Sequence, residues 1–180
     1  MGEFHYEGHR IEYDVYGEGD RAVVLAHGLL MNRRMYGRLG PALAERGNRA
    51  ICVDLLGHGR SDRPEDLRRY SMPLFARQME ALLDHLGLDT AVVGGTSLGA
   101  NVALELVTRR PERVRGLLIE MPVFDNALSG VAATFAPVML DLRLGRPVLE
   151  IVARLTSAIP RTNYLLDVGL DWIRQSPVIL

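Results

Sequence analysis

A single serine stands between two glycines where a buried strand is expected to give way to a helix. Residues 95–99 read Gly-Thr-Ser-Leu-Gly, after the apolar run 91–94 and before a helical pattern over 100–110. A serine in such a turn is held in a strained bend with its hydroxyl exposed, which suits a nucleophile. Ser97 would also lie at a helix N-terminus, where backbone N–H groups favour developing negative charge. The alternative is a simple helix cap, because serine is a common N-cap residue.

A second loop could supply the other half of an acyl-transfer site. His27 and Gly28 follow the apolar run 22–26, and a His-Gly pair in this place shapes a loop whose next backbone N–H points into the site. The N–H groups of Leu29 and Leu98 would then form an oxyanion hole, in which each donor is worth several kcal/mol to the transition state. Gly28 could otherwise simply permit a turn. The pattern favours a loop-organising role for His27 over general-base catalysis.

A nucleophilic serine needs a base, and no histidine follows His85 although the chain runs to residue 180. His58 lies in the glycine-dense segment 54–62, at the strand end where parallel sheets place their sites. A structural role in that loop is favoured for His58. An unusual base role for it, or for His27, is the alternative. The sequence has no metal-ligand spacing and no phosphate-binding loop, which predicts neither a metal nor a cofactor.

Composition and charge limit the class of protein. A chain of 180 residues with 48% apolar and 24% charged side chains suits one globular domain, and a net charge of −1 offers no basic field for nucleic acid. The single cysteine, Cys52, is expected to be a buried small hydrophobe rather than a reactive thiol. The N-terminus lacks the features of a secretory signal, and the uncharged stretch 126–140 is too short to span a membrane. These features predict a cytoplasmic protein without a membrane span.

Strands and helices alternate over the first two thirds of the chain. The patterns predict strands over 4–6, 11–16, 22–26, 50–53, 90–93 and 115–120, and helices over 35–46, 73–86 and 98–109. The first two strands form an expected hairpin, and the runs 22–26 and 50–53 are apolar throughout, which is typical of parallel strands covered on both faces. This order predicts the α/β class with a mostly parallel sheet. Three amphipathic helices are then expected over 128–142, 148–158 and 164–173.

Together these motifs resemble the α/β-hydrolase superfamily, in its cap-bearing branch of esterases and related hydrolases. The matching segments cover about residues 4–121 and follow the family's order, at 17–19, 27–29, 54–62 and 95–99. The resemblance implies that residues 1–121 form the N-terminal part of the hydrolase core, with its first six strands, and that 122–180 form a helical cap. A serine at the elbow disfavours the dehalogenase and epoxide-hydrolase chemistries of the superfamily, which use an aspartate there.

The resemblance also indicates which parts of the family's fold have no counterpart in this sequence. In the family, the catalytic acid usually follows the seventh strand and the histidine follows the eighth, after the cap. Neither strand is found, so the chain is expected to be a C-terminally truncated hydrolase or one half of a split one. A minority of members place the acid after the sixth strand, which makes Glu120 a candidate acid and Asp125 a weaker one. Otherwise Glu120 is a strand-end carboxylate that faces solvent or an arginine.

Two functions of different classes fit these observations. In the first, a serine hydrolase of carboxylic esters or related acyl compounds, Ser97 attacks the carbonyl and a histidine takes its proton. The Leu-, Val- and Ala-rich cap favours a lipophilic small-molecule acyl substrate. The second is a non-catalytic ligand-binding domain with a hydrolase-like pocket, which the missing base would suit. In either case, the open edge of the sixth strand invites self-association or a partner chain.

Overall fold

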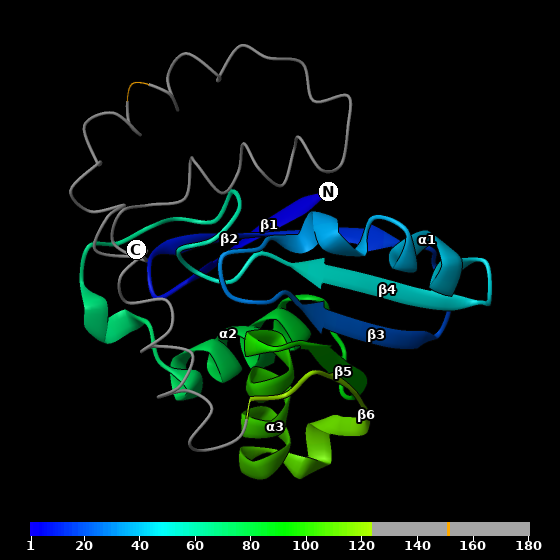
Figure 1. The fold of residues 1–180 in the computed structure, drawn as a ribbon. Coiled ribbons are helices and arrows are strands. Elements are labelled where there is room, and N and C mark those ends of the chain that lie inside the picture. Colours follow the sequence, from blue (N-terminus) through cyan, green and yellow to red (C-terminus); the bar gives the residue numbers. More distant parts are fainter. Residues whose placement is uncertain (124–150, 152–180) are drawn as a thin grey trace.

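The computed structural model describes residues 1–123 and residue 151, and its centre is a six-stranded sheet in the order β1-β2-β4-β3-β5-β6 (Figure 1). The hairpin of β1 and β2 joins β4 in antiparallel fashion, whereas β4, β3, β5 and β6 are parallel to one another. The α/β class and the mostly parallel sheet are thus confirmed. The strands are β1 (Gly2–Tyr6), β2 (His9–Tyr16), β3 (Arg21–Ala26), β4 (Asn48–Val53), β5 (Ala91–Thr96) and β6 (Val114–Glu120).

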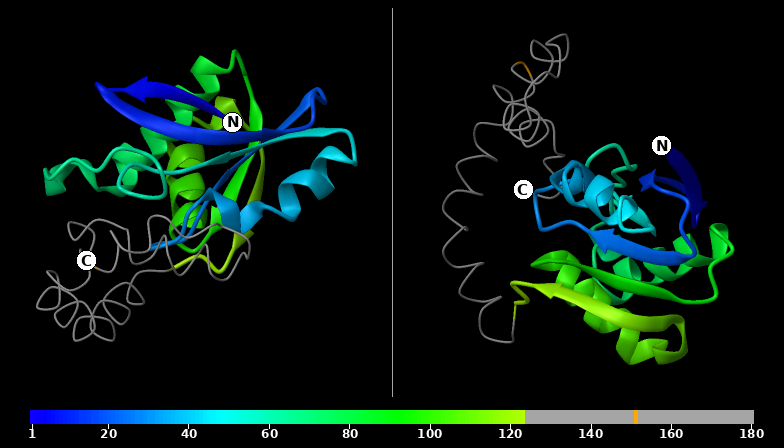
Figure 2. Two further views of the ribbon diagram at one scale, coloured as in Figure 1. Left: turned by 90° about the horizontal axis from the view of Figure 1, so that it is seen from above. Right: turned by 90° about the vertical axis from the view of Figure 1, so that its right-hand side faces the viewer.

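Helices cover both faces of this sheet (Figures 1 and 2). On one face α2 and α3 pack side by side, with α3 against β5 and β6, and on the other α1 packs against β4. Within residues 1–123, three short 3₁₀ helices lie in the connections. The helices are α1 (Leu39–Ala44), α2 (Met72–His85), α3 (Leu98–Arg109), η1 (Arg33–Tyr36), η2 (Leu67–Arg69) and η3 (Pro111–Arg113).

Alternate side chains of the central strands enter two separate clusters of apolar residues. The larger cluster lies under α2 and α3, and the smaller one includes Val23, Leu25, Tyr36 and Cys52. Because both faces are buried, the strands carry the continuous apolar runs that the sequence shows. Each large side chain buried in this way stabilises the fold by roughly 1.5–3 kcal/mol. Burial, followed by the nearby carboxylate of Asp14, raises the pKa of the Cys52 thiol to about 12, which confirms an inert, buried cysteine.

The observed elements differ from the expected ones most clearly before β4. A single helix was expected over 35–46, but the structure has η1, a break at residues 37–38, and the short helix α1. Pro41 explains the break, because a continuous helix would need an N–H at this position to bond the carbonyl of Gly37. By contrast α3 spans the expected residues 98–109, and β5 continues three residues further than expected, to Thr96.

Other expectations fall on residues that the structure does not describe. The cap expected over 122–180, its three helices and Asp125 lie outside the described residues, apart from residues 122 and 123 and the exposed Ile151. Among the helices of the described part, none has the length and apolar character that crossing a bilayer requires.

Two glycines allow β5 and α3 to close tightly on the end of β3. A Cβ atom on Gly95 would lie 2.1 Å from the carbonyl oxygen of Ala26, and one on Gly99 would lie 1.8 Å from the same oxygen. Both distances are far below van der Waals contact, so a side chain at either position would force the strand and helix apart. The glycines on each side of Ser97 therefore set the position of the turn that carries it.

Substitution of Gly99 tests this packing. Gly99→Ala is expected to lower the free energy of unfolding by about 2 kcal/mol or more, because a backbone carbonyl cannot move aside cheaply. Urea unfolding followed by circular dichroism measures the change. The matched control is Gly116→Ala in β6, where a Cβ would meet its nearest neighbour at an ordinary 3.6 Å; its effect should stay within about 0.5 kcal/mol. Equal losses in the two variants would contradict the packing argument.

Candidate active site

Ser97 occupies a strained backbone conformation between β5 and α3. Its φ of +52° and ψ of −108° lie outside the helical and extended regions, a state that costs about 1–3 kcal/mol. Its N–H donates to the carbonyl of Glu120 at 2.9 Å, and its carbonyl accepts the N–H of Asn101. The side chain is half-buried and makes no capping hydrogen bond to the helix. The simple helix-cap alternative therefore does not describe Ser97, whose hydroxyl remains unpaired within the described part of the chain.

The loop after β3 lies against Ser97. A Cβ atom placed on Gly28 would be 3.8 Å from the Cβ of Ser97 and 3.5 Å from the carbonyl oxygen of Thr96. The loop turns back at once, because the N–H of Met31 donates to the carbonyl of Gly28 at 3.0 Å. Within the described residues, the N–H of Leu29 donates to no acceptor. The fold thus brings the expected donor loop beside the expected nucleophile.

The second expected donor follows directly from the helix. Leu98 is the first residue of α3, so its N–H has no partner within the helix. The helix dipole adds partial positive charge at this end. The structure therefore places two N–H groups that have no acceptor among the described residues, those of Leu29 and Leu98, on the loop and on the helix that meet at Ser97.

His27 holds the donor loop through both of its ring nitrogens. Its Nε2 accepts the N–H of Leu55 at 3.1 Å, which requires the ring proton to be on Nδ1, and Nδ1 donates to the carbonyl of Gly28 at 2.8 Å. Complete burial lowers the pKa of His27 to about 4. These contacts match the loop-organising role favoured from the sequence and leave no nitrogen free to accept a proton from serine.

His58 is also buried and neutral. Its ring packs 4.7 Å from the ring of His27, centre to centre, and its Nδ1 lies 3.1 Å from the carbonyl oxygen of Leu56. Burial and the neighbouring His27 lower the pKa of His58 to about 3. A group with so low a pKa is a poor proton acceptor at neutral pH, which favours the structural role. All five histidines lie in the described part, and none of them hydrogen-bonds the Ser97 hydroxyl.

Glu120 stands next to the Ser97 turn and is exposed. The hydroxyl of Thr96 donates to its Oε2 at 2.6 Å, and the hydroxyl of Tyr36 lies 3.2 Å from the same Thr96 oxygen while donating to the carbonyl of Ala26. Burial raises the pKa of Tyr36 to about 12, so this hydroxyl keeps its proton. The strand-end carboxylate is thus bound by a threonine rather than an arginine, at the position expected for a candidate acid.

Sequence reasoning missed Arg33, which is 4% exposed and forms a buried ion pair with Asp54 at the end of β4. Arg33 falls in a stretch that reads as ordinary loop and helix, and its partners are 19 to 21 residues away in the sequence. Nothing in the local pattern marks it as different from the neighbouring Arg34. Only the fold brings it to these carboxylates.

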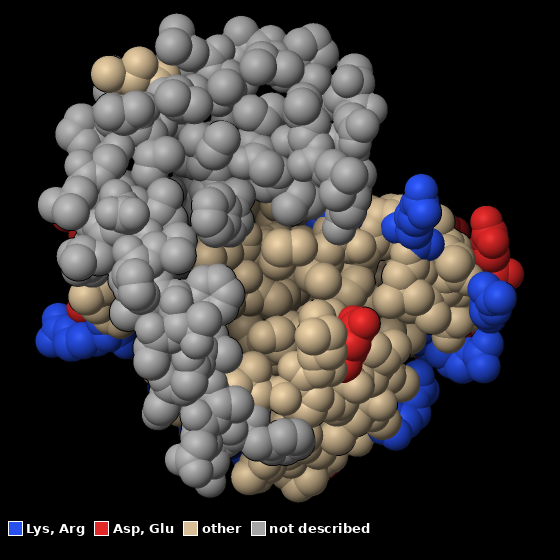
Figure 3. All heavy atoms as spheres, viewed as in Figure 1, with Lys and Arg blue, Asp and Glu red and all other residues tan. Residues whose placement is uncertain are grey.

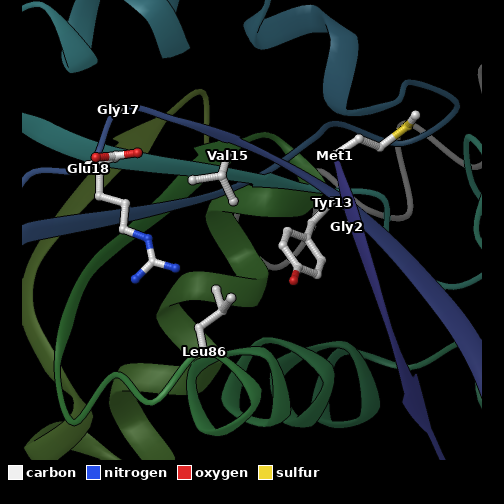
Figure 4. Close-up of a pocket in the computed structure, with 8 residues that line it drawn as sticks. Met1, Gly2, Tyr13, Val15, Gly17, Glu18 and Leu86 are labelled. Carbon is white, nitrogen blue, oxygen red and sulfur yellow. The ribbon is translucent and has the colours of Figure 1, made fainter.

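A hollow of about 700 Å³ lies elsewhere on the molecule, beside β2 and the end of α2 (Figure 4). Tyr13, Val15 and Leu86 point toward it, and Glu18 lies at its upper end in that view. None of its lining residues belongs to the loop after β3 or to the Ser97 turn. The described residues contain no cluster of side chains suited to a metal ion. In Figure 3, charged side chains gather toward the rim of the described surface, and one acidic side chain lies in its uncharged middle.

Comparison with known proteins gives a consistent family. The model of the alpha/beta hydrolase fold family matches residues 21–144, more than half of the chain. The bifunctional epoxide hydrolase 2 of Sus scrofa is 34% identical over 110 residues, which cover 61% of this chain and 20% of the relative. An uncharacterized protein of Mycobacterium tuberculosis is 30% identical over 166 residues, which cover 88% of this chain and 48% of the relative. The chain thus spans half or less of the length of these relatives.

Two solved structures of hydrolases have a fold similar to that of this chain. Est816, described as an N-acyl homoserine lactone degrading enzyme, superposes with a TM-score of 0.70 at 26% identity, over 98% of this chain and 66% of that one. An epoxide hydrolase from Vigna radiata gives a TM-score of 0.71 at 18% identity, over 96% of this chain and 70% of that one, and shows the likeness of fold alone.

The two buried histidines predict a specific loss of stability in acid. Their folded pKa values, about 4 and about 3, lie below the unfolded value near 6.5, so the unfolded state binds more protons as pH falls. Their stabilisation is complete above pH 6.5 and is lost progressively as pH falls toward 4. Each histidine should contribute up to about 1.4 kcal/mol per pH unit.

Urea titrations between pH 7 and 4.5 measure this slope. His58→Gln should make the loss with falling pH shallower by up to about 1.4 kcal/mol per unit. The control is His5→Gln, which changes an exposed side chain and leaves the buried pair intact. A slope that is the same in His58→Gln as in the unmodified chain would show that the native state protonates His58 readily.

Proposed function

Because this chain belongs to the alpha/beta hydrolase fold family, we propose that it is a serine hydrolase of carboxylic esters or related acyl compounds, acting through an acyl-enzyme at Ser97. The observation that carries the proposal is the strained Ser97: within the described part of the chain its hydroxyl is unpaired, and the loop and helix that meet there carry two backbone N–H groups without an acceptor. A serine kept only to cap a helix would bond to that helix and would need no left-handed φ.

The proposed reaction uses few groups of the chain. The Ser97 oxygen attacks the carbonyl carbon while a base takes the hydroxyl proton, and the N–H groups of Leu29 and Leu98 bind the resulting oxyanion. The intermediate collapses to the acyl-enzyme, and the leaving alcohol takes the proton back from the base. Water then repeats the sequence, with the carboxylic acid as product and Ser97 restored.

The base is assigned to a histidine outside these 180 residues, on a further segment of the protein or on another chain. The five histidines of this chain support that assignment, because His27 and His58 are buried and neutral and none of the five bonds to Ser97. Glu120 is the candidate acid of the same proposal. Its carboxylate is already oriented by Thr96, one residue before the nucleophile. A partner chain, if it supplies the base, would meet the described core at the open edge of β6.

The serine also bears on the choice among the chemistries found in relatives. Epoxide hydrolases are among the relatives and structural neighbours. This chain has a serine at the turn, whereas in the superfamily that it resembles epoxide-hydrolase chemistry uses an aspartate at that place. A serine hydroxyl is suited to acyl transfer, and Est816, which degrades N-acyl homoserine lactones, acts on an acyl compound. We therefore assign a small acyl substrate to the proposal. Its lipophilic character follows from the Leu-, Val- and Ala-rich sequence after residue 122, and a cytoplasmic location is a further part of the proposal.

A second candidate is a ligand-binding domain without catalysis. The observation that favours it is the lack of any histidine in contact with Ser97. In that case the strained turn would be a feature of the fold that serves only to shape a pocket.

Chemical rescue separates the two candidates. The purified chain is treated with a fluorophosphonate probe, with and without imidazole as an external base, and the adduct is mapped by mass spectrometry. We expect an adduct on Ser97 that forms at least about tenfold faster with imidazole, since loss of a triad base costs several orders of magnitude.

Two variants serve as controls for the labelling. Ser97→Ala should remove the adduct, and Ser71→Ala should keep it, because Ser71 lies at the start of α2 and, like Ser97, makes no capping hydrogen bond. Failure of the folded chain to label at Ser97, at any imidazole concentration, would rule out the hydrolase and leave the binding domain.

A further inference from the structure

The buried Arg33 is the centre of an ionic cluster that joins strand β2, through Glu12 and Asp14, to Asp54 at the end of β4. Its guanidinium pairs with Asp54, lies 3.1 Å from a carboxylate oxygen of Glu12, and lies 3.0 Å from one of Asp14. Its own backbone N–H also donates to the second carboxylate oxygen of Asp54 at 2.7 Å. Main chain and side chain of one residue are thus both bound to the end of β4.

Asp54 is a firm anchor for these contacts. Its side chain is completely buried, and the N–H of Arg60 donates to it at 2.9 Å. Its main chain is fixed as well, because its N–H donates to the carbonyl of Glu12 and its carbonyl accepts the hydroxyl of Ser61. Burial works against the charge of Arg33, but the carboxylates of Asp54 and then Asp14 outweigh it and raise the pKa of the guanidinium.

The other end of the same loop, at His27, is bound to Leu55, the residue that follows Asp54 in the chain. His27 accepts the N–H of Leu55 and donates to the carbonyl of Gly28, while Arg33 is bound to Asp54. The stretch 27–33 therefore begins and ends on two adjacent residues that follow β4. Leu29 lies between these two attachments, next to Gly28, where a Cβ atom would lie 3.8 Å from the Cβ of Ser97.

We infer that Arg33 is a positioning residue of the site, which holds the N–H of Leu29 in place beside Ser97 by binding the end of the donor loop to Asp54. The inference rests on the proposed function, in which that N–H binds the oxyanion. An arginine suits this task because its planar guanidinium binds several carboxylates at fixed angles, which the point charge of a lysine cannot reproduce. A donor displaced by a fraction of an ångström loses much of its effect on the transition state.

Arg10 provides a matched control within the same cluster. It is also a cation bound to Glu12, at 3.3 Å, and it lies 3.7 Å from Asp62, but it contacts no residue of the loop 27–33. Substitution of either arginine would weaken the ionic cluster in general. Only substitution of Arg33 should displace the N–H of Leu29.

The experiment compares Arg33→Lys with Arg10→Lys in the full chain, with imidazole present. The maximal rate of phosphonylation at Ser97 is expected to fall at least about tenfold in Arg33→Lys, with the half-saturating probe concentration within about twofold, because a transition-state donor is lost rather than binding. Amide exchange measured by NMR at Met31, whose N–H closes the loop around Leu29, should accelerate at least about tenfold in the same variant. Arg10→Lys should leave both values near those of the unmodified chain.

Each outcome has a separate meaning. If the unmodified chain labels but Arg33→Lys matches it, or if Arg10→Lys loses as much, Arg33 is not a positioning residue. If the unmodified chain does not label at all, the proposed function fails, and exchange at Met31 alone shows whether Arg33 holds the loop. Should Arg33→Lys not fold, Asp54→Asn replaces it, since the amide keeps an acceptor for the Arg33 N–H and removes the charge. The same loss of labelling rate and the same faster exchange at Met31 are expected in this variant. Unchanged values would overturn the inference.

Discussion

The carbonyl group of Ala26, at the end of β3, is the point on which the rest of the site depends. Gly95 and Gly99 pack against its oxygen so closely that neither position has room for a Cβ atom, and the hydroxyl of Tyr36 donates to it at 2.9 Å. Strand β5, helix α3 and helix η1 are therefore all fixed to one backbone group. Ser97 lies between the two glycines, and it retains a strained φ of +52° because the backbone on both sides of it cannot move.

The ionisable side chains described around Ser97 do not supply a positive charge for a developing oxyanion. His27 and His58 are neutral, and Arg33 faces three carboxylates and has little charge to offer a ligand. Negative charge that develops near Ser97 would therefore meet backbone N–H dipoles and the positive end of α3 rather than a cation. Such dipoles are fixed by the fold and need no rearrangement during the reaction, which is the condition for effective stabilisation of an oxyanion.

Local features of the site and fold could be predicted from the sequence, and long-range ones could not. The Ser97 turn and α3 were predictable because glycines, an apolar run and helical spacing stand within twenty residues of one another. The helix expected over 35–46 was wrong. That prediction followed the apolar spacing and did not allow for the missing N–H of Pro41. Arg33 could not be found, since its role comes from carboxylates that only sheet pairing brings near. The bond from Thr96 to Glu120 likewise depends on the register of β5 and β6.

If Ser97 is the nucleophile, as proposed, the fold can hold it in place without its base. The strained turn is maintained by β3, β5 and α3, and the donor loop by His27 and Arg33, so neither depends on a group that would accept the serine proton. Ser97 is half-buried, and its hydroxyl has no partner among the described residues. An unpaired hydroxyl costs little free energy where water can reach it. In the proposed reaction, a base is therefore needed for the chemistry but not for the shape of the site. The proposed division, with nucleophile and oxyanion donors here and the histidine elsewhere, is for this reason compatible with a stable fold.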